Sequence, residues 1–578
     1  MKTILQYLSL FLFLIFLNGC AKKLEITEKP IDFQFITIKN GDTFQSLAKE
    51  YNDSEKLAWR IEEFNVTKQL IPGQELIIPL KPFRPGGLTA QGYQLVPVLS
   101  YHNFCKGWSN NTLTVSAKNF RDQLNYLKNH NYHVITIDQL LGFLEFGQVP
   151  EKSVLISIDD GWISSYKIAY PILKDFGFNA TLFIPSHFIE SGKKNAVSWD
   201  QIREMVSDST IDIQCHTKSH RDLSTMKGSE SFTDYMQAVE QDILHSKQTI
   251  YNKLGKEVIA LAYPFGNTNS LVMAIIKKHG YKAAFTVKRK GNPFYKQSFL
   301  LNRSMIFGTF NINRFAKNLK TFEEFKITES EPIDTLSSLA NIALSNPEDY
   351  ESKSQWRTAV LAWKLRRDRL ISQKHSGSTK TDMESLDQSI LNAKQKVFDL
   401  TSKLNEIAKQ YYSIALKNID NKKAKKPLLQ ALLYSPESQA PIDLFQTNMG
   451  KLRPLIYQVK ENDSFSSIAH QLYQDPKKAI LIPLFHDNIN DENDLVPGIK
   501  LSLPALTVGT EIVSTSAKAC NIVLTESKEQ MAIEYYDKAI ENFNLDQIPK
   551  AIENLKTAIC LNPKLSQAIE MLEMLKDL

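Results

Sequence analysis

Short apolar runs alternate with helical patterns between residues 95 and 325. Seven of these runs have the length and β-branched content of buried strands, and stretches with apolar residues at helical spacing separate them. The runs begin at Val96, Val134, Val154, Ala180, Ile211, Val258 and Ala283. Strands that alternate with helices form parallel sheets, so we predict an α/β domain that closes, or nearly closes, into a distorted (β/α)7-type barrel.

A different pattern occurs twice, at residues 33–80 and 456–504. Each copy has an apolar run, a turn with helix N-cap residues, helical patterns, and a Pro-Gly turn into a closing apolar run. An internal repeat is a strong sign of a repeated structural unit. We therefore predict two small βααβ modules, the second with Asn462 in place of Gly41.

Helical patterns fill residues 330–450 and 521–578. In each region paired tyrosines are followed by small residues at helical spacing and by a proline five residues after an alanine. These segments resemble single tetratricopeptide-type helix pairs. Such repeats need packed neighbours for stability, and we expect them to pack or to bind a protein partner.

The first twenty residues resemble the signal peptide of an exported lipoprotein. Lys2 precedes an apolar run from Ile4 to Leu17 that is too short to span a bilayer. A Leu-Asn-Gly-Cys sequence ending at Cys20 resembles the bacterial lipobox, which implies that Cys20 is acylated and anchors the protein in a membrane. Since Ala21 follows, we expect the outer membrane if the host has two. An ordinary secretory signal is the alternative.

Charge and cysteine content narrow the function classes only slightly. A net charge of +6 over 578 residues, without an aromatic-basic module, does not indicate nucleic-acid binding. Export permits disulfides, but the cysteines after Cys20 lack metal-type Cys-x-x-Cys spacing, and their pairing stays open, with free thiols slightly favoured. These cysteines are Cys105, Cys215, Cys520 and Cys560.

Two polar clusters follow predicted strands. Asp159 and Asp160 come directly after the run that begins at Val154, and His216 and His220 follow the run that begins at Ile211. A parallel barrel gathers its catalytic groups at the carboxyl ends of its strands. One carboxylate and two imidazoles suit a zinc ion with a position left open, and the other carboxylate is then available as a base. The pattern indicates a metal-dependent hydrolase.

These motifs resemble the NodB-type polysaccharide deacetylases, carbohydrate esterase family 4, over residues 95–325. The similar segments are Ser157–Trp162, His216–His220 and a variant third motif, Ala262–Gly266. Tyr101-His102 resembles the exported branch of the family, which acts on poly-N-acetylglucosamine. Joint occurrence of the motifs in this order, at strand ends, is much more specific than any one of them.

The resemblance also implies roles for single residues. Asp160, His216 and His220 would hold a divalent metal, most simply Zn²⁺, with Co²⁺ or Ni²⁺ as alternatives. Asp159 would be the general base, and the backbone N–H of Phe265 would donate to the oxyanion.

The chain departs from the family pattern at two roles. Ala262 stands where the family has the arginine that orients the base, and Arg303 is our candidate to supply that charge. The usual late histidine is missing, and His102 is our candidate for the general acid. A purely structural role is the alternative for both Arg303 and His102. Trp162 and Tyr263 are candidates for contact with the sugar, with core packing as the alternative for Trp162.

The βααβ modules resemble LysM modules, which implies a glycan ligand that contains N-acetylglucosamine. We therefore expect a deacetylase acting on N-acetylglucosamine polymers, held near them by its modules. The modules slightly favour peptidoglycan, and the Tyr-His and third-motif variants favour poly-N-acetylglucosamine. A weakly active or inactive glycan-binding scaffold and an O-acetyl polysaccharide esterase are the alternatives.

Overall fold

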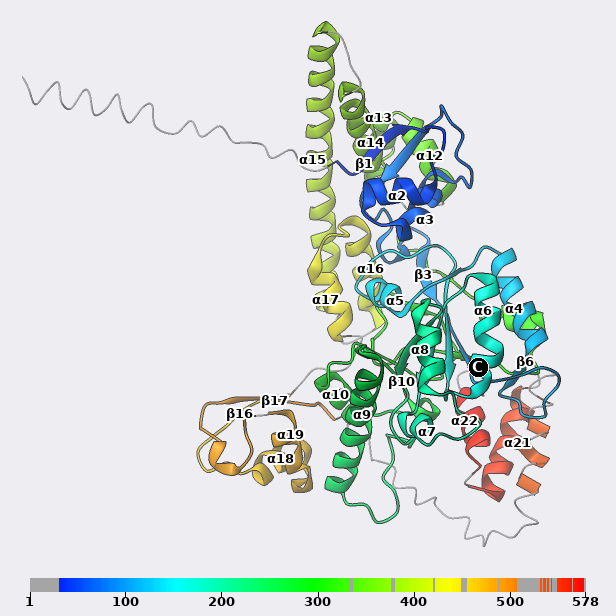
Figure 1. The fold of residues 1–578 in the computed structure, drawn as a ribbon. Helices are drawn as coiled ribbons and strands as arrows, with labels where there is room; N and C mark the ends of the chain where they lie inside the picture. The colour runs from blue at the N-terminus through cyan, green and yellow to red at the C-terminus, as the bar shows by residue number, and fades with distance from the viewer. Residues whose placement is uncertain are drawn as a thin grey trace, which may run out of the picture. The chain divides into compact units, whose positions relative to one another are not determined.

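The computed structural model describes residues 31–329, 331, 336–375, 380–418, 422–448, 455–486 and 488–506, and, with gaps, 531–575. These residues belong to two compact units (Figure 1). Unit 1 contains the chain up to Lys81 with Leu339–Asn346 and Val360–Val397, and unit 2 contains the rest. The predicted signal segment with Cys20, and also Cys520, lie outside the described residues.

A parallel sheet forms the centre of unit 2, as predicted. Its strand order is β12-β11-β10-β9-β8-β4-β14, and β7 pairs with β8. The seven predicted strands are all present, and the two-residue β14 is an eighth that the sequence pattern did not reveal. The strands are β4 (Val98–Tyr101), β7 (His133–Val134), β8 (Ser153–Asp159), β9 (Ala180–Ile184), β10 (Ile211–Cys215), β11 (Ala260–Ala262), β12 (Ala283–Phe285) and β14 (Ser304–Met305).

The two edges of this sheet approach each other. Leu301, three residues before β14, forms a parallel bridge with Phe285 on β12. The Thr286 N–H donates to the Leu301 carbonyl at 2.7 Å, and the Leu301 N–H donates to the Ala284 carbonyl at 3.0 Å. These bonds curl the sheet into a nearly closed barrel, as the alternating strands and helices predict.

Helices pack around the strands (Figure 1), and capping residues mark the ends of several of them. Ser198 and Ser231 begin α8 and α9 with capping boxes, in which side chain and backbone at the first turn bond reciprocally. Gly255 ends α9 in a left-handed conformation, with φ of 67°. The helices are α4 (Ala117–Asn129), α5 (Ile137–Leu144), α6 (Tyr170–Phe176), α8 (Trp199–Ser207), α9 (Phe232–Leu254) and α10 (Ser270–Lys278).

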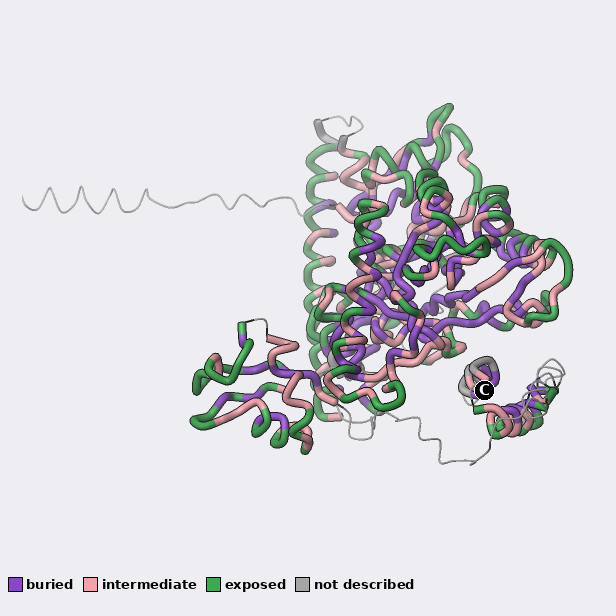
Figure 2. Tube along the Cα trace, turned by 60° about the horizontal axis from the view of Figure 1, so that its bottom comes forward, coloured by how far each residue is buried: buried purple, intermediate pink, exposed green. Residues whose placement is uncertain are grey.

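Alternation along the strands divides the core of unit 2 into two clusters. On β8 the side chains of Val154, Ile156 and Ile158 join the cluster under the surrounding helices. Leu155, between them, joins a second cluster with Phe183 and other residues that face the barrel interior. β8 and β9 are buried along their whole length, and Figure 2 shows several long buried stretches of the chain. Asp159 has the same parity as Leu155, so its side chain enters the barrel.

A helix far along the chain also belongs to the interior cluster. Four leucines of α16 (Lys425–Tyr434) are buried together with barrel residues such as Val98 and Leu155. The Lys425 ammonium lies over three aromatic rings and donates to the Tyr93 hydroxyl at 2.7 Å. The leucines are Leu428, Leu429, Leu432 and Leu433. The core of unit 2 therefore includes residues well beyond 325. Identification of this region as tetratricopeptide-like remains a prediction.

The first βααβ module lies in unit 1. β1 (Phe33–Thr37) pairs antiparallel with β2 (Glu75–Pro79), and α2 (Phe44–Asn52) and α3 (Ala58–Asn65) lie between them in the chain. The Asp368 carboxylate on α14 (Trp356–His375) accepts from the backbone N–H groups of Asp32 and Phe33, at 2.9 and 3.0 Å. The module is thus packed against a helix of the same unit.

The second copy has the same order of elements. β16 (Leu455–Gln458) pairs antiparallel with β17 (Lys500–Leu503), with α18 (Phe465–Tyr473) and α19 (Leu481–Phe485) between them in the chain. Its first helix begins with the same type of capping box as the first copy. Asn462 adopts a positive φ of 64°, as Gly41 does at 91°, because asparagine tolerates this region. The substitution at this turn therefore preserves the backbone conformation.

Cys105 and Cys215 form no disulfide, and Cys215 is fully buried, as expected for a free thiol. Among the described residues, no helix combines the length and the apolar character needed to cross a membrane.

Candidate metal and catalytic site

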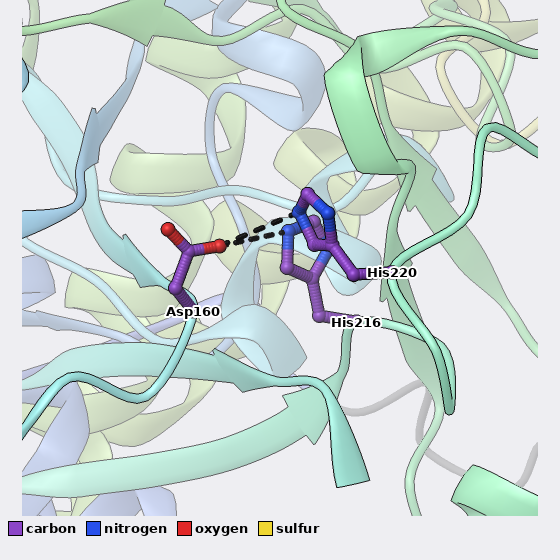
Figure 3. Close-up of side chains that lie close together, drawn as sticks. All are labelled: Asp160, His216 and His220. Atoms are coloured by element: carbon purple, nitrogen blue, oxygen red, sulfur yellow. Dashed lines mark ion pairs between the residues drawn. The ribbon is translucent and has the colours of Figure 1, made fainter. Parts of the chain in front are cut away.

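Asp160, His216 and His220 come together at the carboxyl ends of the barrel strands. Asp160 follows β8, and the two histidines lie in the loop after β10. The Asp160 Oδ1 atom is 3.5 Å from Nε2 of each histidine, and the three ligand atoms lie within 4.8 Å of one another. Figure 3 shows the carboxylate facing both rings. The structure thus groups the three residues that the sequence assigned to a metal.

Hydrogen bonding orients His216 for metal binding. Its Nδ1 lies 2.7 Å from the Ala262 carbonyl oxygen, so Nδ1 carries a proton, and Nε2 is the ring nitrogen that faces Asp160. Histidine ligands of metals are commonly held in this way. The donor set of two imidazoles and one carboxylate fits a divalent ion such as Zn²⁺ with an open position.

The metal-ligand loop is fixed by Asp242 on α9. One oxygen of this buried carboxylate accepts from the backbone N–H groups of Lys218, at 2.5 Å, and Ser219, at 2.8 Å. Its other oxygen accepts from the Ser219 hydroxyl. Asp242 therefore holds the backbone between the two histidines.

Several residues of the site have strained backbone conformations. Asp160, Thr217, His220 and Phe265 have φ values of 74°, 68°, 57° and 60°. Positive φ is uncommon outside glycine, and such residues concentrate at functional sites. The surrounding hydrogen bonds, including the bond from the His220 N–H to the Thr217 hydroxyl at 3.0 Å, hold this geometry.

Asp159 and Arg303 form a buried ion pair beside the metal ligands. Arg303 Nη1 donates to Asp159 Oδ1 at 2.7 Å, and Arg303 Nε donates to the Thr286 carbonyl at 3.1 Å. The two side chains are 2% and 1% exposed. Burial raises the pKa of Asp159, but the charge of Arg303, followed by His216 and His102, outweighs it and leaves this pKa below its ordinary value. Arg303 thus occupies the position predicted for it, and Asp159 is an anion at neutral pH.

The pKa of Asp160 is also lowered. Burial raises it, but the bonds from His216 and His220 lower it well below its ordinary value. Because the ligand carboxylate is ionised at neutral pH, it does not need to lose a proton before it binds a cation.

His102 lies next to this cluster and is partly buried. Burial is the largest cause that lowers its pKa, although Asp160 and Asp159 raise it. Its Nδ1 is buried and has no hydrogen-bond partner among the described residues. The ring is therefore mostly neutral near pH 7, with a polar atom available for another molecule.

The structure places the two candidate residues of the third motif differently. The backbone N–H of Phe265 donates to no other group in the described chain, and the Phe265 ring lies 4.9 Å from the His220 ring. Tyr263, by contrast, is 0% exposed, and its hydroxyl donates to the Phe299 carbonyl at 3.1 Å. The prediction that Tyr263 contacts the sugar is wrong, because its side chain is part of the core.

Two contacts of the site were absent from the sequence prediction. One is the set of hydrogen bonds from the histidine loop to Asp242. Asp242 lies 22 residues after His220, on a helix with no recognisable motif. The other is a hydrogen bond from the Trp162 indole N–H to Asp160 Oδ2 at 3.0 Å. The sequence predicts Trp162 only as a residue that stacks on the sugar or packs in the core.

Two segments of the chain match known protein families, and one of them contains Asp160, His216 and His220. Residues 146–284 match the family model for polysaccharide deacetylase, and residues 36–79 match the model for the LysM domain. A poly-beta-1,6-N-acetyl-D-glucosamine N-deacetylase of Staphylococcus epidermidis is 32% identical over 183 residues, 31% of this chain and 62% of that protein. A protein of the same description from Staphylococcus aureus is 29% identical over 180 residues, with the same shares.

Solved structures also resemble this chain. The Streptococcus pyogenes deacetylase PplD in complex with acetate is 24% identical and covers 40% of this chain and 99% of its own, with a TM-score of 0.36. This chain spans less than two thirds of the length of the curated relatives described above. The matched segments contain Asp160, His216 and His220 and the first βααβ module, so these two parts of the chain match the polysaccharide deacetylase and LysM family models.

Proposed function

We propose that this protein is a metal-dependent deacetylase that removes N-acetyl groups from polysaccharides containing N-acetylglucosamine. The observation that carries the proposal is the juxtaposition of Asp160, His216 and His220 with the buried Asp159–Arg303 pair. A divalent ion bound there would supply an activated water molecule and would polarise the acetyl carbonyl.

The residues of this chain would then perform the proton transfers. Asp159 takes a proton from the attacking water, and Arg303 keeps the carboxylate ionised and oriented. The Phe265 N–H donates to the oxygen that gains negative charge as the tetrahedral centre forms. When the C–N bond breaks, the amine leaving group takes a proton, for which we assign His102. Because burial lowers the pKa of His102, the neutral ring must gain a proton before it can donate one to the amine.

Two polymers are the main substrate candidates. The names of the staphylococcal relatives support poly-N-acetylglucosamine, and the LysM domain supports peptidoglycan as well. The buried Asp159–Arg303 pair weakens the case for a non-enzymatic scaffold, which rested partly on the arginine missing from the third motif. Hydrolysis of O-acetyl esters would use the same groups, so the activity test described below also includes an O-acetylated polymer.

We further propose that acylated Cys20 anchors the protein on the outer side of a membrane, with the helical regions available to a protein partner. The lipobox-like sequence supports the anchor. Cys20→Ala should release the protein from the membrane fraction. Retention of the variant in that fraction would contradict the lipid anchor.

Acetate release tests the activity. The chain without its first twenty residues would be supplied with Zn²⁺ and offered peptidoglycan, poly-N-acetylglucosamine and an O-acetylated xylan. We expect release from an N-acetylglucosamine polymer, and loss of that release in Asp159→Asn with bound metal retained. Metal binding without release from any N-acetylated polymer would contradict the proposal, and release from xylan alone would indicate an esterase.

A further inference from the structure

The two oxygens of the Asp160 carboxylate have different partners. Oδ1 faces the Nε2 atoms of His216 and His220, each at 3.5 Å. Oδ2 accepts the indole N–H of Trp162 at 3.0 Å. Only Oδ1 is therefore directed at the metal position. Oδ2 is held by an uncharged donor, the indole N–H of the residue two positions later in the chain.

The indole that makes this bond is itself held in place. Trp162 forms an antiparallel bridge with Ala196, and its ring meets Phe188 edge-on at 5.1 Å between centroids. On either side of Trp162, the Ile163 N–H donates to the Asn195 carbonyl at 2.8 Å, and the Val197 N–H donates to the Gly161 carbonyl at 3.0 Å. The turn after β8 is thus joined to the segment before α8, and the N–H direction is fixed.

We propose that Trp162 is a positioning residue of the metal site, which keeps Asp160 bound to the metal through Oδ1 alone. This inference rests on the metal-dependent function proposed above. A hydrogen bond to Oδ2 opposes rotation of the carboxylate about its Cβ–Cγ bond and draws charge away from that oxygen. Both effects disfavour a two-oxygen contact, so that a coordination position stays open for water and for the acetyl oxygen.

This role differs from a role in sugar binding. A ring that stacks on a sugar would change the affinity for the polymer and leave metal binding unchanged. A positioning residue acts on the metal even when no substrate is present. Partners that hold ligand side chains typically contribute 10- to 100-fold to metal affinity.

The test compares Trp162→Phe with Trp199→Phe in the chain without its first twenty residues. Phenylalanine keeps an aromatic ring but removes the indole N–H. Trp199 is a matched control, because its buried indole N–H has no partner among the described residues. The affinity for Zn²⁺ would be measured by competition with a chelator, and the visible spectrum of the Co²⁺ form would report coordination.

We expect Trp162→Phe to weaken Zn²⁺ binding about 10- to 100-fold and to change the Co²⁺ spectrum, with no such change in Trp199→Phe. In an Asp160→Asn background, Trp162→Phe should lower the affinity for Zn²⁺ by a much smaller factor. An equal loss in both backgrounds would show a general structural effect and overturn the proposal. Unchanged affinity would also overturn it, including the case in which only the KM for the polymer rises. A parent chain that binds no metal would instead overturn the proposed function itself.

Discussion

Asp159 and Arg303 make the clearest residue-level pair in the site, although 144 positions separate them in the chain. Asp159 has the strand parity that directs its side chain into the barrel, and Arg303, directly before β14, reaches it there. In a buried position the carboxylate would otherwise gain a proton more readily, because burial disfavours its charged form. The guanidinium reverses this effect, so the pair accounts for a base that stays ionised without the usual arginine of the third motif.

Replacing Arg303 should therefore change the pH dependence of the reaction. In Arg303→Gln, burial would raise the pKa of Asp159 with less opposition, and the acidic limb of the kcat/KM profile should move up by about 1–3 pH units. The profile of Arg121→Gln, which breaks an exposed ion pair, is the control. An acidic limb that does not move in Arg303→Gln would show that Arg303 does not control the base.

Single residues also show how far the sequence could predict the site. The grouping of Asp160, His216 and His220 was predictable because motif order and strand ends coincide. The indole bond of Trp162 was not, because its partner depends on the direction of one side chain. The prediction that Tyr263 contacts the sugar was wrong for a related reason. Tyr263 follows β11 in the third motif, but its hydroxyl donates to the Phe299 carbonyl inside the core.

At the scale of elements, α9 supports the loop that carries both histidines. The Asp242 carboxylate accepts two backbone N–H groups and one hydroxyl from this loop. Hydrogen bonds to a charged group are worth more than neutral ones, about 1.5–3 kcal/mol each. Asp242 therefore contributes both to the fold and to the geometry of the metal ligands.

Asp242→Asn should weaken this support. We expect the free energy of unfolding to fall by about 1–3 kcal/mol and the metal affinity to fall with it, because an amide cannot accept three bonds as a carboxylate does. Asp122→Asn, which breaks an exposed ion pair with Lys118 on α4, is the control. Denaturant unfolding and metal titration measure the two effects. Full metal affinity in Asp242→Asn would contradict a positioning role for this residue.

Helices and strands with long sequence patterns were predictable, and a very short strand was not. The seven strand-like runs were found because each has several apolar residues next to a helical pattern. β14 was missed because two residues, Ser304 and Met305, are too few to show a period. The repeated βααβ modules were predictable because the same turn and cap residues recur in both copies.

At the scale of the molecule, the described core of unit 2 combines residues from distant parts of the chain. The leucines of α16 lie in the same cluster as barrel residues that are more than 250 positions earlier. The sequence located the helix but not its partner, since apolar periodicity shows that a face is buried and not what covers it.

This packing predicts that α16 stabilises the deacetylase core. Leu429→Ala should lower the free energy of unfolding of unit 2 by about 2–5 kcal/mol, because a fully buried leucine leaves a cavity. Leu416→Ala, at an exposed position on α15 (Lys380–Lys417), should have little effect. Denaturant unfolding followed by intrinsic fluorescence compares them. Equal stability of the two variants would show that α16 is not part of this core.

The central claim is that Asp160, His216 and His220 hold one catalytic divalent ion. Its most direct test is to remove metal with a chelator, add Zn²⁺ back in steps, and follow bound metal and acetate release together. We predict that release is lost on removal and returns in proportion to bound metal, up to one equivalent per chain, and that His216→Ala binds no such equivalent. Full acetate release from the metal-free protein would contradict the claim.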